Sequence, residues 1–165
     1  MLKPKIRFRG FEEKWSNKKV KEFGNIITGY TPSRNNHDLW KGNLNWISAQ
    51  DLNKKYVIDT IEHINHDSAN KTRILPKDSL IVTCIASIGL NALLKKEAVT
   101  NQQINGIICD KEFDKEFLYY LFVKNKESLL QSASKTAVPI ISKSDFEEIN
   151  WRFICKHRYF NSIKQ

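Results

Sequence analysis

Cysteine and long apolar runs are scarce in this chain of 165 residues. The three cysteines, Cys84, Cys109 and Cys155, lie far apart and form neither a CxxC pair nor a Cys/His cluster with zinc spacing. An odd set of isolated thiols favours a reducing compartment. No run of about eighteen apolar residues occurs, and the first ten residues hold no apolar segment of signal-peptide length. These absences predict a cytoplasmic protein that does not contact a membrane.

The motifs of enzymes that act on nucleic acid are also missing. There is no GxxxxGK[ST] phosphate loop, which argues against an NTP-driven motor. The four prolines form neither the Asn/Asp-Pro-Pro-aromatic turn nor the Pro-Cys pair that base methyltransferases use. No GxSxG segment supplies a nucleophilic serine. We therefore expect no catalytic residue, no bound metal and no cofactor.

One enzymatic alternative stays open, a small metal-dependent nuclease. Such enzymes gather carboxylates around a cation, and Asp78 and Glu97, both in a region of predicted strands, could approach each other beside neighbouring lysines. Glu12-Glu13-Lys14 matches a nuclease spacing, but no predicted strand precedes it. His63 and His66 fall in a predicted strand, where their spacing points them to opposite faces. The histidine pair is therefore a poor metal site.

Basic residues outnumber acidic residues by 27 to 18, which gives a formal net charge of +9. The excess is concentrated in residues 1–50, which carry ten basic and four acidic side chains. From Lys3 to Arg9, basic residues alternate with other residues, so an extended segment would place its cations on one side. A positive surface favours an anionic partner, and double-stranded DNA is the first to test.

Short apolar segments separated by turn-forming residues dominate the middle of the chain. They predict strands over residues 44–48, 56–58, 61–64, 79–84, 88–94 and 104–109. The intervals are too short for helical crossovers, which favours antiparallel or mixed pairing. One helix is expected to begin after Asp114, and a short one is expected over residues 145–149, behind a capping box formed by Ser144 and Glu147.

These elements predict an α/β protein of the α+β type, with a mixed, mostly antiparallel sheet of short strands and flanking helices. A chain of 165 residues can bury a sizeable core, and eighteen aromatic side chains supply bulky material for it. We divide the chain into a basic N-terminal arm (residues 1–14), a single domain (15–150) and a short tail (151–165).

Several segments resemble the specificity subunits of type I restriction-modification systems. The similarity begins at residues 6–11, IRFRGF, which together with Trp15 resemble an RFxGFxxxW leader. It continues in the same order, over roughly residues 5–150, through Gly29-x-Thr31-Pro32-Ser33, Trp40-x-Gly42, Trp46-Ile47-Ser48-x-x-Asp51-Leu52, Leu75-Pro76-x-Asp78-Ser79-Leu80, Ile88-Gly89, Thr100-Asn101-Gln102-Gln103 and Ile141-Ser142-Lys143-x-Asp145-Phe146. Each segment alone is weak evidence, but the ordered set is specific.

The resemblance implies a target-recognition domain, an α/β module without a catalytic centre that reads one half of a bipartite DNA target. Methylation and cleavage would then belong to separate methylation (M) and restriction (R) subunits. A member of that family carries two such domains, each followed by a long helix. Residues 151–165 do not resemble that helix. A truncated product, an isolated domain, a domain that works with a second specificity half, and a decoy that binds methylation subunits therefore stay open.

Polar loops supply the candidate DNA contacts, which we expect to converge on one concave face that fits a duplex groove. Asn and Gln pair with adenine and Arg with guanine, whereas phosphate accepts any well-placed cation. The candidates for base readout are Arg34, Asn35, Asn36, Gln50, Asn53 and Gln102. The candidates for phosphate contact are Lys54, Lys55, Lys71, Arg73 and Lys135. Trp40 and Trp46 are predicted to be core residues rather than stacking platforms for a flipped base.

Overall fold

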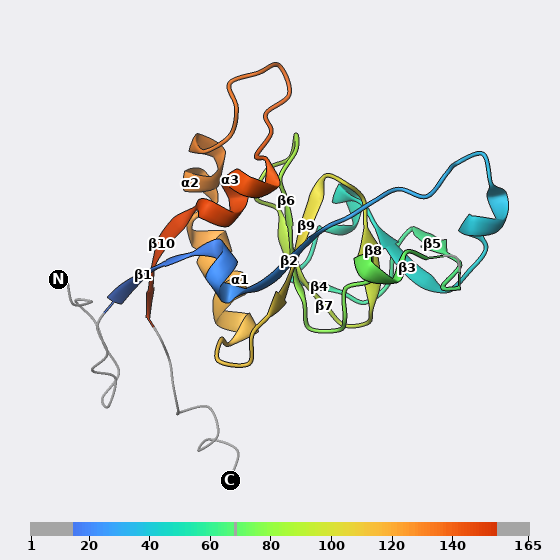
Figure 1. Cartoon of the computed structure of the whole chain (residues 1–165), viewed down its shortest axis with the longest axis horizontal. Coiled ribbons are helices and arrows are strands. Elements are labelled where there is room, and N and C mark those ends of the chain that lie inside the picture. The colour runs from blue at the N-terminus through green and yellow to red at the C-terminus, as the bar shows by residue number, and fades with distance from the viewer. Residues whose placement is uncertain (1–14, 68, 155–165) are drawn as a thin grey trace, which may run out of the picture.

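The computed structural model describes residues 15–67 and 69–154, whose strands form three sheets (Figure 1). A two-stranded sheet pairs β1 (Trp15–Lys19) with β10 (Asn150–Ile154). The central sheet has five strands in the order β2 (Gly24–Thr28), β9 (Ile104–Cys109), β6 (Leu80–Thr83), β7 (Asn91–Leu94) and β4 (Tyr56–Val57). The third sheet has three strands in the order β5 (Glu62–Ile64), β3 (Leu44–Ile47) and β8 (Ala98–Thr100).

Most of the strand pairs in these sheets are antiparallel. Only β3 with β8 and β4 with β7 run parallel within the described residues. Three α-helices flank the sheets, namely α1 (Lys115–Lys124), α2 (Lys126–Gln131) and α3 (Lys143–Glu148). Short 3-10 helices lie in the connections, namely η1 (Val20–Phe23), η2 (His37–Trp40), η3 (Ala49–Asp51) and η4 (Lys71–Arg73). The predicted α+β class with a mixed, mostly antiparallel sheet is confirmed.

Helices α1 and α3 begin at side chains that satisfy free backbone N–H groups. The carboxylate of Asp114 accepts a hydrogen bond from the backbone N–H of Phe117 at 2.8 Å, as predicted for the start of α1. The predicted cap of the last helix is wrong by two residues. Ser142 has the extended backbone of a cap, and its hydroxyl accepts from the N–H of Asp145 at 3.1 Å, whereas Ser144 lies inside α3.

The central sheet is buried on both faces. Side chains alternate along a strand, so Leu80 and Val82 of β6 face the helices, where they join a core that includes Phe122. Ile81 faces the other side and packs in a second core. A third core surrounds Trp46, which is 5% exposed, under the small sheet. The prediction that Trp46 is a core residue is confirmed.

Several strands differ from the sequence-based expectations. β7 begins at Asn91 rather than residue 88, because positive φ angles at Ala86 (60°) and Gly89 (83°) turn the chain before it. β1, β2, β8 and β10 carry weak local signals and were not predicted. β10 also crosses the predicted domain boundary at residue 150. The predicted basic arm (residues 1–14) and Cys155 lie outside the described residues.

Trp151 shows that β10 belongs to the packed structure. Its side chain is 5% exposed and meets Phe122 edge to face, with 4.7 Å between ring centroids. We predict that Trp151→Ala lowers the free energy of unfolding by about 3–5 kcal/mol, the usual cost of removing a buried aromatic side chain. Urea unfolding followed by circular dichroism measures this change. The neighbouring exposed Arg152→Ala is the control and should shift it by less than about 0.5 kcal/mol; equal effects would contradict the packing.

Candidate nucleic-acid interface

Strand pairing gathers four polar connections on one side of the molecule, which we call the loop edge. It comprises residues 29–36, 48–55, 84–90 and 101–103. The end of β2 pairs with the start of β9, and the end of β6 pairs with that same start. β3 and β8 run parallel, so they end together. These connections lie along the upper side of the sheets in Figure 1.

The central turn (residues 100–103) links the other three connections through backbone hydrogen bonds. Its carbonyl at Thr100 accepts from the N–H of Tyr30 at 2.8 Å, and its carbonyl at Gln103 accepts from the N–H of Cys84 at 2.7 Å. The N–H of Asn101 donates to the carbonyl of Ile47 at 2.8 Å. Because Ile47, Cys84, Thr100 and Asn101 are buried, displacing the turn would leave several of these backbone groups unsatisfied.

Gly29 and Gln102 complete the contact between the central turn and the first connection. A Cβ at Gly29 would lie 2.1 Å from the carbonyl oxygen of Thr100, so only glycine fits there. The hydroxyl of Thr31 donates to Oε1 of Gln102 at 2.6 Å. The side chain of Gln102 is otherwise exposed. These residues belong to two of the segments that carry the sequence resemblance.

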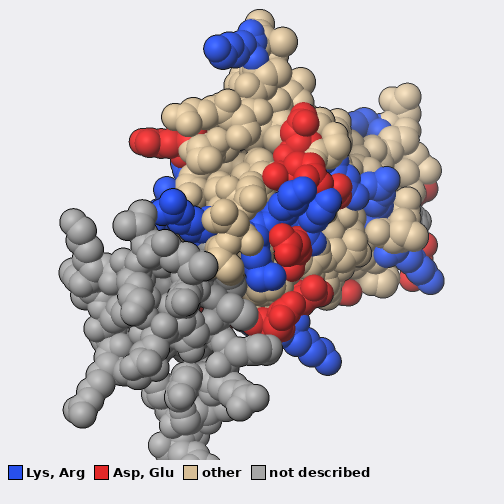
Figure 2. All heavy atoms as spheres, turned by 60° about the vertical axis from the view of Figure 1, so that its left-hand side comes forward, with Lys and Arg blue, Asp and Glu red and all other residues tan. Residues whose placement is uncertain are grey.

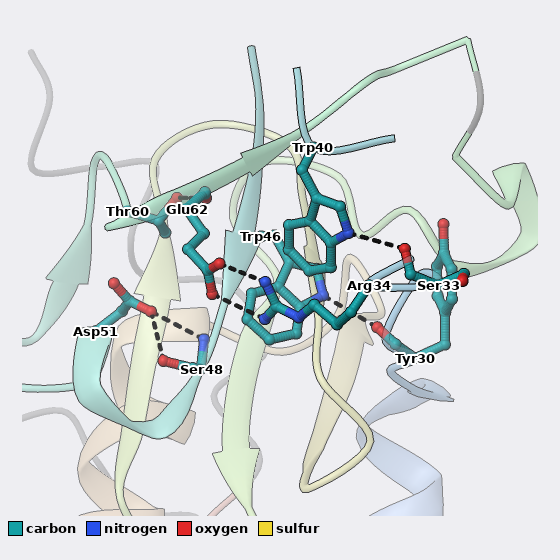
Figure 3. Close-up of polar contacts among 9 residues, drawn as sticks. All are labelled: Tyr30, Ser33, Arg34, Trp40, Trp46, Ser48, Asp51, Thr60 and Glu62. Carbon is teal, nitrogen blue, oxygen red and sulfur yellow. Dashed lines mark hydrogen bonds and ion pairs between the residues drawn. The ribbon is translucent and has the colours of Figure 1, made fainter. Parts of the chain in front are cut away.

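Arg34 is held by Glu62 and by two tryptophans (Figure 3). Its guanidinium donates to both carboxylate oxygens of Glu62, at 2.5 and 3.0 Å. Its central carbon lies 3.5 Å from the ring centroid of Trp40 and 5.0 Å from that of Trp46. Each indole N–H in turn donates to a backbone carbonyl. Arg34 therefore has a full set of internal partners, although 52% of its side chain is exposed.

Asp51 fixes the connection that follows β3, next to Arg34 and Glu62 in Figure 3. One of its oxygens accepts from the N–H of Ser48 at 2.8 Å and from its hydroxyl at 3.0 Å. The other oxygen accepts from the N–H of Ile61 at 3.1 Å. Residues 48–55 and 58–61 are thereby joined side by side.

Two hollows lie on either side of Asn53 and Lys54, and both residues line each hollow. The first hollow, of about 340 Å³, is also lined by Lys55, Lys126 and Tyr119, and no carboxylate lines it. The second hollow, of about 350 Å³, is also lined by Gln50, Asp51, Ile58, Asp59 and Ile61. The two hollows therefore differ in chemistry: the first is cationic, and the second combines amide, apolar and carboxylate groups.

The side chain of Lys55, at the first hollow, binds other side chains of the protein. It forms an ion pair with Glu116, donates to the hydroxyl of Tyr120 at 3.2 Å and lies 4.4 Å from the centroid of that ring. The hydrogen bond to Glu116 raises the pKa of Lys55 above its usual range. Figure 2 shows basic and acidic side chains interspersed on one face of the molecule.

Besides Lys71, five of the predicted contact residues have exposed side chains without a hydrogen bond or ion pair to any residue of 15–67 or 69–154. They are Asn35, Gln50, Asn53, Lys54 and Lys135. Lys135 lies on a projecting loop, which is tied to the loop edge by the hydrogen bond from the N–H of Ala86 to the carbonyl of Pro139 at 3.0 Å. Asn35, Gln50, Asn53 and Lys54 therefore lie on the loop edge, whereas Lys135 lies on a loop that is only joined to it.

Three other predicted contacts are placed differently. The side-chain oxygen of Asn36 accepts from the N–H of Asp38 at 3.1 Å and caps η2. Arg73 donates to the backbone carbonyl of Thr28 at 2.5 Å. Lys71 is exposed on the connection between β5 and β6, which meets the loop edge where the N–H of Asn70 donates to the hydroxyl of Tyr30 at 2.8 Å.

The acidic residues considered for a nuclease do not form a cluster. Asp78 pairs with Lys115 at 2.6 Å, and Glu97 lies 3.3 Å from His66. His63 instead pairs with Asp59 at 2.8 Å. Across residues 15–67 and 69–154, no group of three or more His, Cys, Asp or Glu side chains could hold a metal ion. No helix of this part of the chain is long and apolar enough to cross a bilayer.

A protein-family comparison matches residues 12–151 to the type I restriction modification DNA specificity domain. The chain belongs to this family. The specificity domain is 36% identical over 108 residues to the HindI specificity subunit of Haemophilus influenzae, with 64% of this chain and 24% of that protein covered. It is 34% identical over 143 residues to the MjaIX specificity subunit of Methanocaldococcus jannaschii, with 82% of this chain and 33% of that protein covered.

Solved structures show the same fold. The specificity domain resembles the S subunit of a type I system from M. genitalium with a TM-score of 0.67 and 17% identity, over 94% of this chain and 38% of that chain. The HsdS subunit from Thermoanaerobacter tengcongensis matches with a TM-score of 0.68 and 13% identity, over 92% and 35%. The chain thus spans about a quarter to two fifths of the relatives' length.

Sequence reasoning missed four residues of this surface. Glu62 and Asp51 hold the loops, and Ile58 and Ile61 border the second hollow. The two isoleucines fall in segments with strand signals, where apolar residues suggest a core. Glu62 binds Arg34, 28 residues away along the chain, so no local pattern indicates it. Asp51 lies in the Ser48-x-x-Asp51 part of a motif, which reflects its bonds to Ser48 but gives no sign of its bond to Ile61, ten residues away.

The contact with Arg34 generates a prediction about acid titration. The hydrogen bond from Arg34 lowers the pKa of Glu62 below its usual value. We predict that Arg34→Met raises the pKa of Glu62 toward its ordinary value, which NMR of the carboxyl carbon measures. Because the folded-state pKa is depressed, ionised Glu62 stabilises the fold above its unfolded-state pKa, and this contribution disappears as the pH falls through the folded-state pKa.

Asn35→Ala is the matched control for that titration, because Asn35 neighbours Arg34 but has an exposed side chain. It should leave the pKa of Glu62 unchanged. An unchanged pKa in the Arg34→Met protein would show that Arg34 does not govern this carboxylate.

Proposed function

We propose that this specificity domain recognises a short sequence of double-stranded DNA and forms one half of a bipartite reader. The supporting observation is the loop edge, which presents exposed amides beside a cation that has no ion pair within the described residues. Asn53 and Lys54 lie at its centre, between the two hollows. Amide side chains match the donor and acceptor pattern of adenine in the major groove, and cations supply phosphate contacts.

The internal contacts divide the candidate residues into two groups. We assign base readout to Asn35, Gln50 and Asn53, whose side chains are exposed on the loop edge. Gln102 is also exposed and stays a candidate through its amide N–H groups, because its Oε1 already accepts from the hydroxyl of Thr31. Phosphate contact falls to Lys54, Lys71 and Lys135, with Lys126 of the first hollow as an addition. The remaining candidates, Arg34, Asn36, Lys55 and Arg73, already bind protein groups and hold the loops in position.

A selection from randomised duplexes tests the proposal. We predict that the protein enriches one short motif, and that Asn53→Ala relaxes the preference at one position of that motif, because a good bidentate base contact is worth about 1–3 kcal/mol. Binding should weaken steeply as salt rises, since cations released from phosphates drive association. No enriched motif, or binding indifferent to salt, would refute the proposal.

Two lysines provide a matched pair for the salt measurement. Lys54 lies on the loop edge. Lys77 is exposed just before the start of β6, whereas the loop edge lies beyond the end of that strand. Lys54→Ala should reduce the slope of log K against log salt by about 1, the value for one lost phosphate contact. Lys77→Ala should leave the slope unchanged.

We also propose that the domain acts in the cytoplasm, within a complex whose methylation (M) and restriction (R) subunits carry the chemistry. The support is membership of the type I restriction modification DNA specificity domain family. A second specificity half would read the other part of the target. A decoy that binds methylation subunits without reading DNA is the alternative.

Co-expression with a methylation subunit separates these possibilities. We predict that the two proteins co-purify and that the complex binds the selected duplex more tightly than the isolated chain does. Co-purification of a complex that binds no duplex would favour the decoy. If the chain repeatedly purified without the cognate methylation subunit after co-expression, the proposed assembly would be contradicted.

A further inference from the structure

Ile58 and Ile61 are the most exposed large hydrophobic side chains in residues 15–67 and 69–154. Their exposed fractions are 61% and 71%. They lie three residues apart in the connection between β4 and β5, and both line the second hollow. Single exposed apolar residues are ordinary on protein surfaces. Two isoleucines at the border of one hollow, beside the candidate base-reading residues Gln50 and Asn53, call for an explanation.

The backbone of this connection is fixed, so the outward direction of the isoleucines is built into the fold. The N–H of Ile61 donates to Asp51 at 3.1 Å. The carbonyl of Ile58 accepts from the amide of Asn45, a residue that is 3% exposed, at 3.3 Å. The hydroxyl of Thr60 donates to the carbonyl of Glu62 at 2.7 Å. The loop is thereby tied at three successive points to the small sheet and to η3.

We propose that Ile58 and Ile61 read thymine, through apolar contact with its C5 methyl group in the major groove. This inference rests on the proposed DNA recognition and names what the second hollow recognises. An A·T pair presents the thymine methyl beside the N6 donor and N7 acceptor of adenine on one groove edge. The hollow offers the complementary set, since isoleucine side chains lie next to the amides of Gln50 and Asn53.

The charges around the hollow favour a base edge over the phosphate backbone. Asp51 and Asp59 both line it, and 68% of the Asp59 side chain is exposed. Carboxylates repel phosphate, whereas the methyl edge of thymine carries no charge. Lys54 stands between this hollow and the first one, which no carboxylate lines. A duplex can therefore place a base pair over the isoleucines and a phosphate beside Lys54.

Replacement of thymine by uracil in the selected duplex removes only the methyl group and tests this contact. We predict that dU at one or two positions weakens binding by the wild-type protein about fourfold, which corresponds to the loss of one buried methyl group. Ile61→Ala or Ile58→Ala should bind the dT and dU duplexes equally at the same position. Both side chains are exposed, so these variants should fold normally, which circular dichroism checks.

Leu130→Ala is the matched control, because Leu130 is 46% exposed on α2 and away from the second hollow. It should retain the full preference for dT. A motif without an A·T pair, no loss at any dU position, or a loss that persists in both isoleucine variants would overturn the thymine contact while leaving DNA recognition intact. Absence of any enriched motif would instead overturn the proposed function itself.

A protein partner is the competing occupant of this surface, and the same variants identify it. If Ile58→Ala and Ile61→Ala abolish co-purification with a methylation subunit but leave duplex binding and the dT preference unchanged, the isoleucines dock a protein. That result would overturn the inference.

Discussion

The turn at residues 100–103, anchored by its buried residues Thr100 and Asn101, is the constraint on which the candidate interface depends. It follows β8 and precedes β9, so it bridges the small sheet and the central sheet. Backbone hydrogen bonds from this turn reach the connections after β2, β3 and β6. Thr100 is fully buried and Asn101 is 9% exposed, and an unsatisfied polar group at such depth is costly. The polar loops are therefore positioned relative to one another by the core.

Net charge alone describes this surface poorly. The chain carries a formal charge of +9, yet Arg34, Lys55 and Lys115 are each paired with a carboxylate. Such pairs cancel much of the field at a distance and fix side chains in place. What distinguishes the loop edge is Lys54, its one cation without an ion pair in the described part of the chain, which lies among exposed amides. Positive charge is thus a local property of a few loops.

Local patterns were sufficient for much of the fold. β3, β6, β9 and α1 follow from apolar segments, turn formers and the Asp114 cap, all of which act over a few residues. β1 and β10 could not be predicted, because each is stabilised by the other across more than a hundred residues. The ordered motifs identified the family, and several of them turn out to surround the central turn.

The candidate site was likewise predictable only where local sequence patterns define it. The sequence located the polar loops, but it could not separate Lys54 from Lys55, which are adjacent and chemically identical. Only the packing of α1, which brings Glu116 and Tyr120 to Lys55, distinguishes them. Likewise Arg34 and Glu62 meet only because η2 and β5 lie together. Contacts between distant segments decide which polar residues are available.

The pairing of β1 with β10 has a consequence for how such a module is carried. Trp15 lies opposite Ile154 in the antiparallel register, at the side of the molecule away from the loop edge (Figure 1). A host chain that contains this module therefore enters and leaves it through neighbouring points. Exchanging one module for another would therefore change the host chain at a single pair of adjacent junctions. The recognised sequence could then change while the rest of the host kept its architecture.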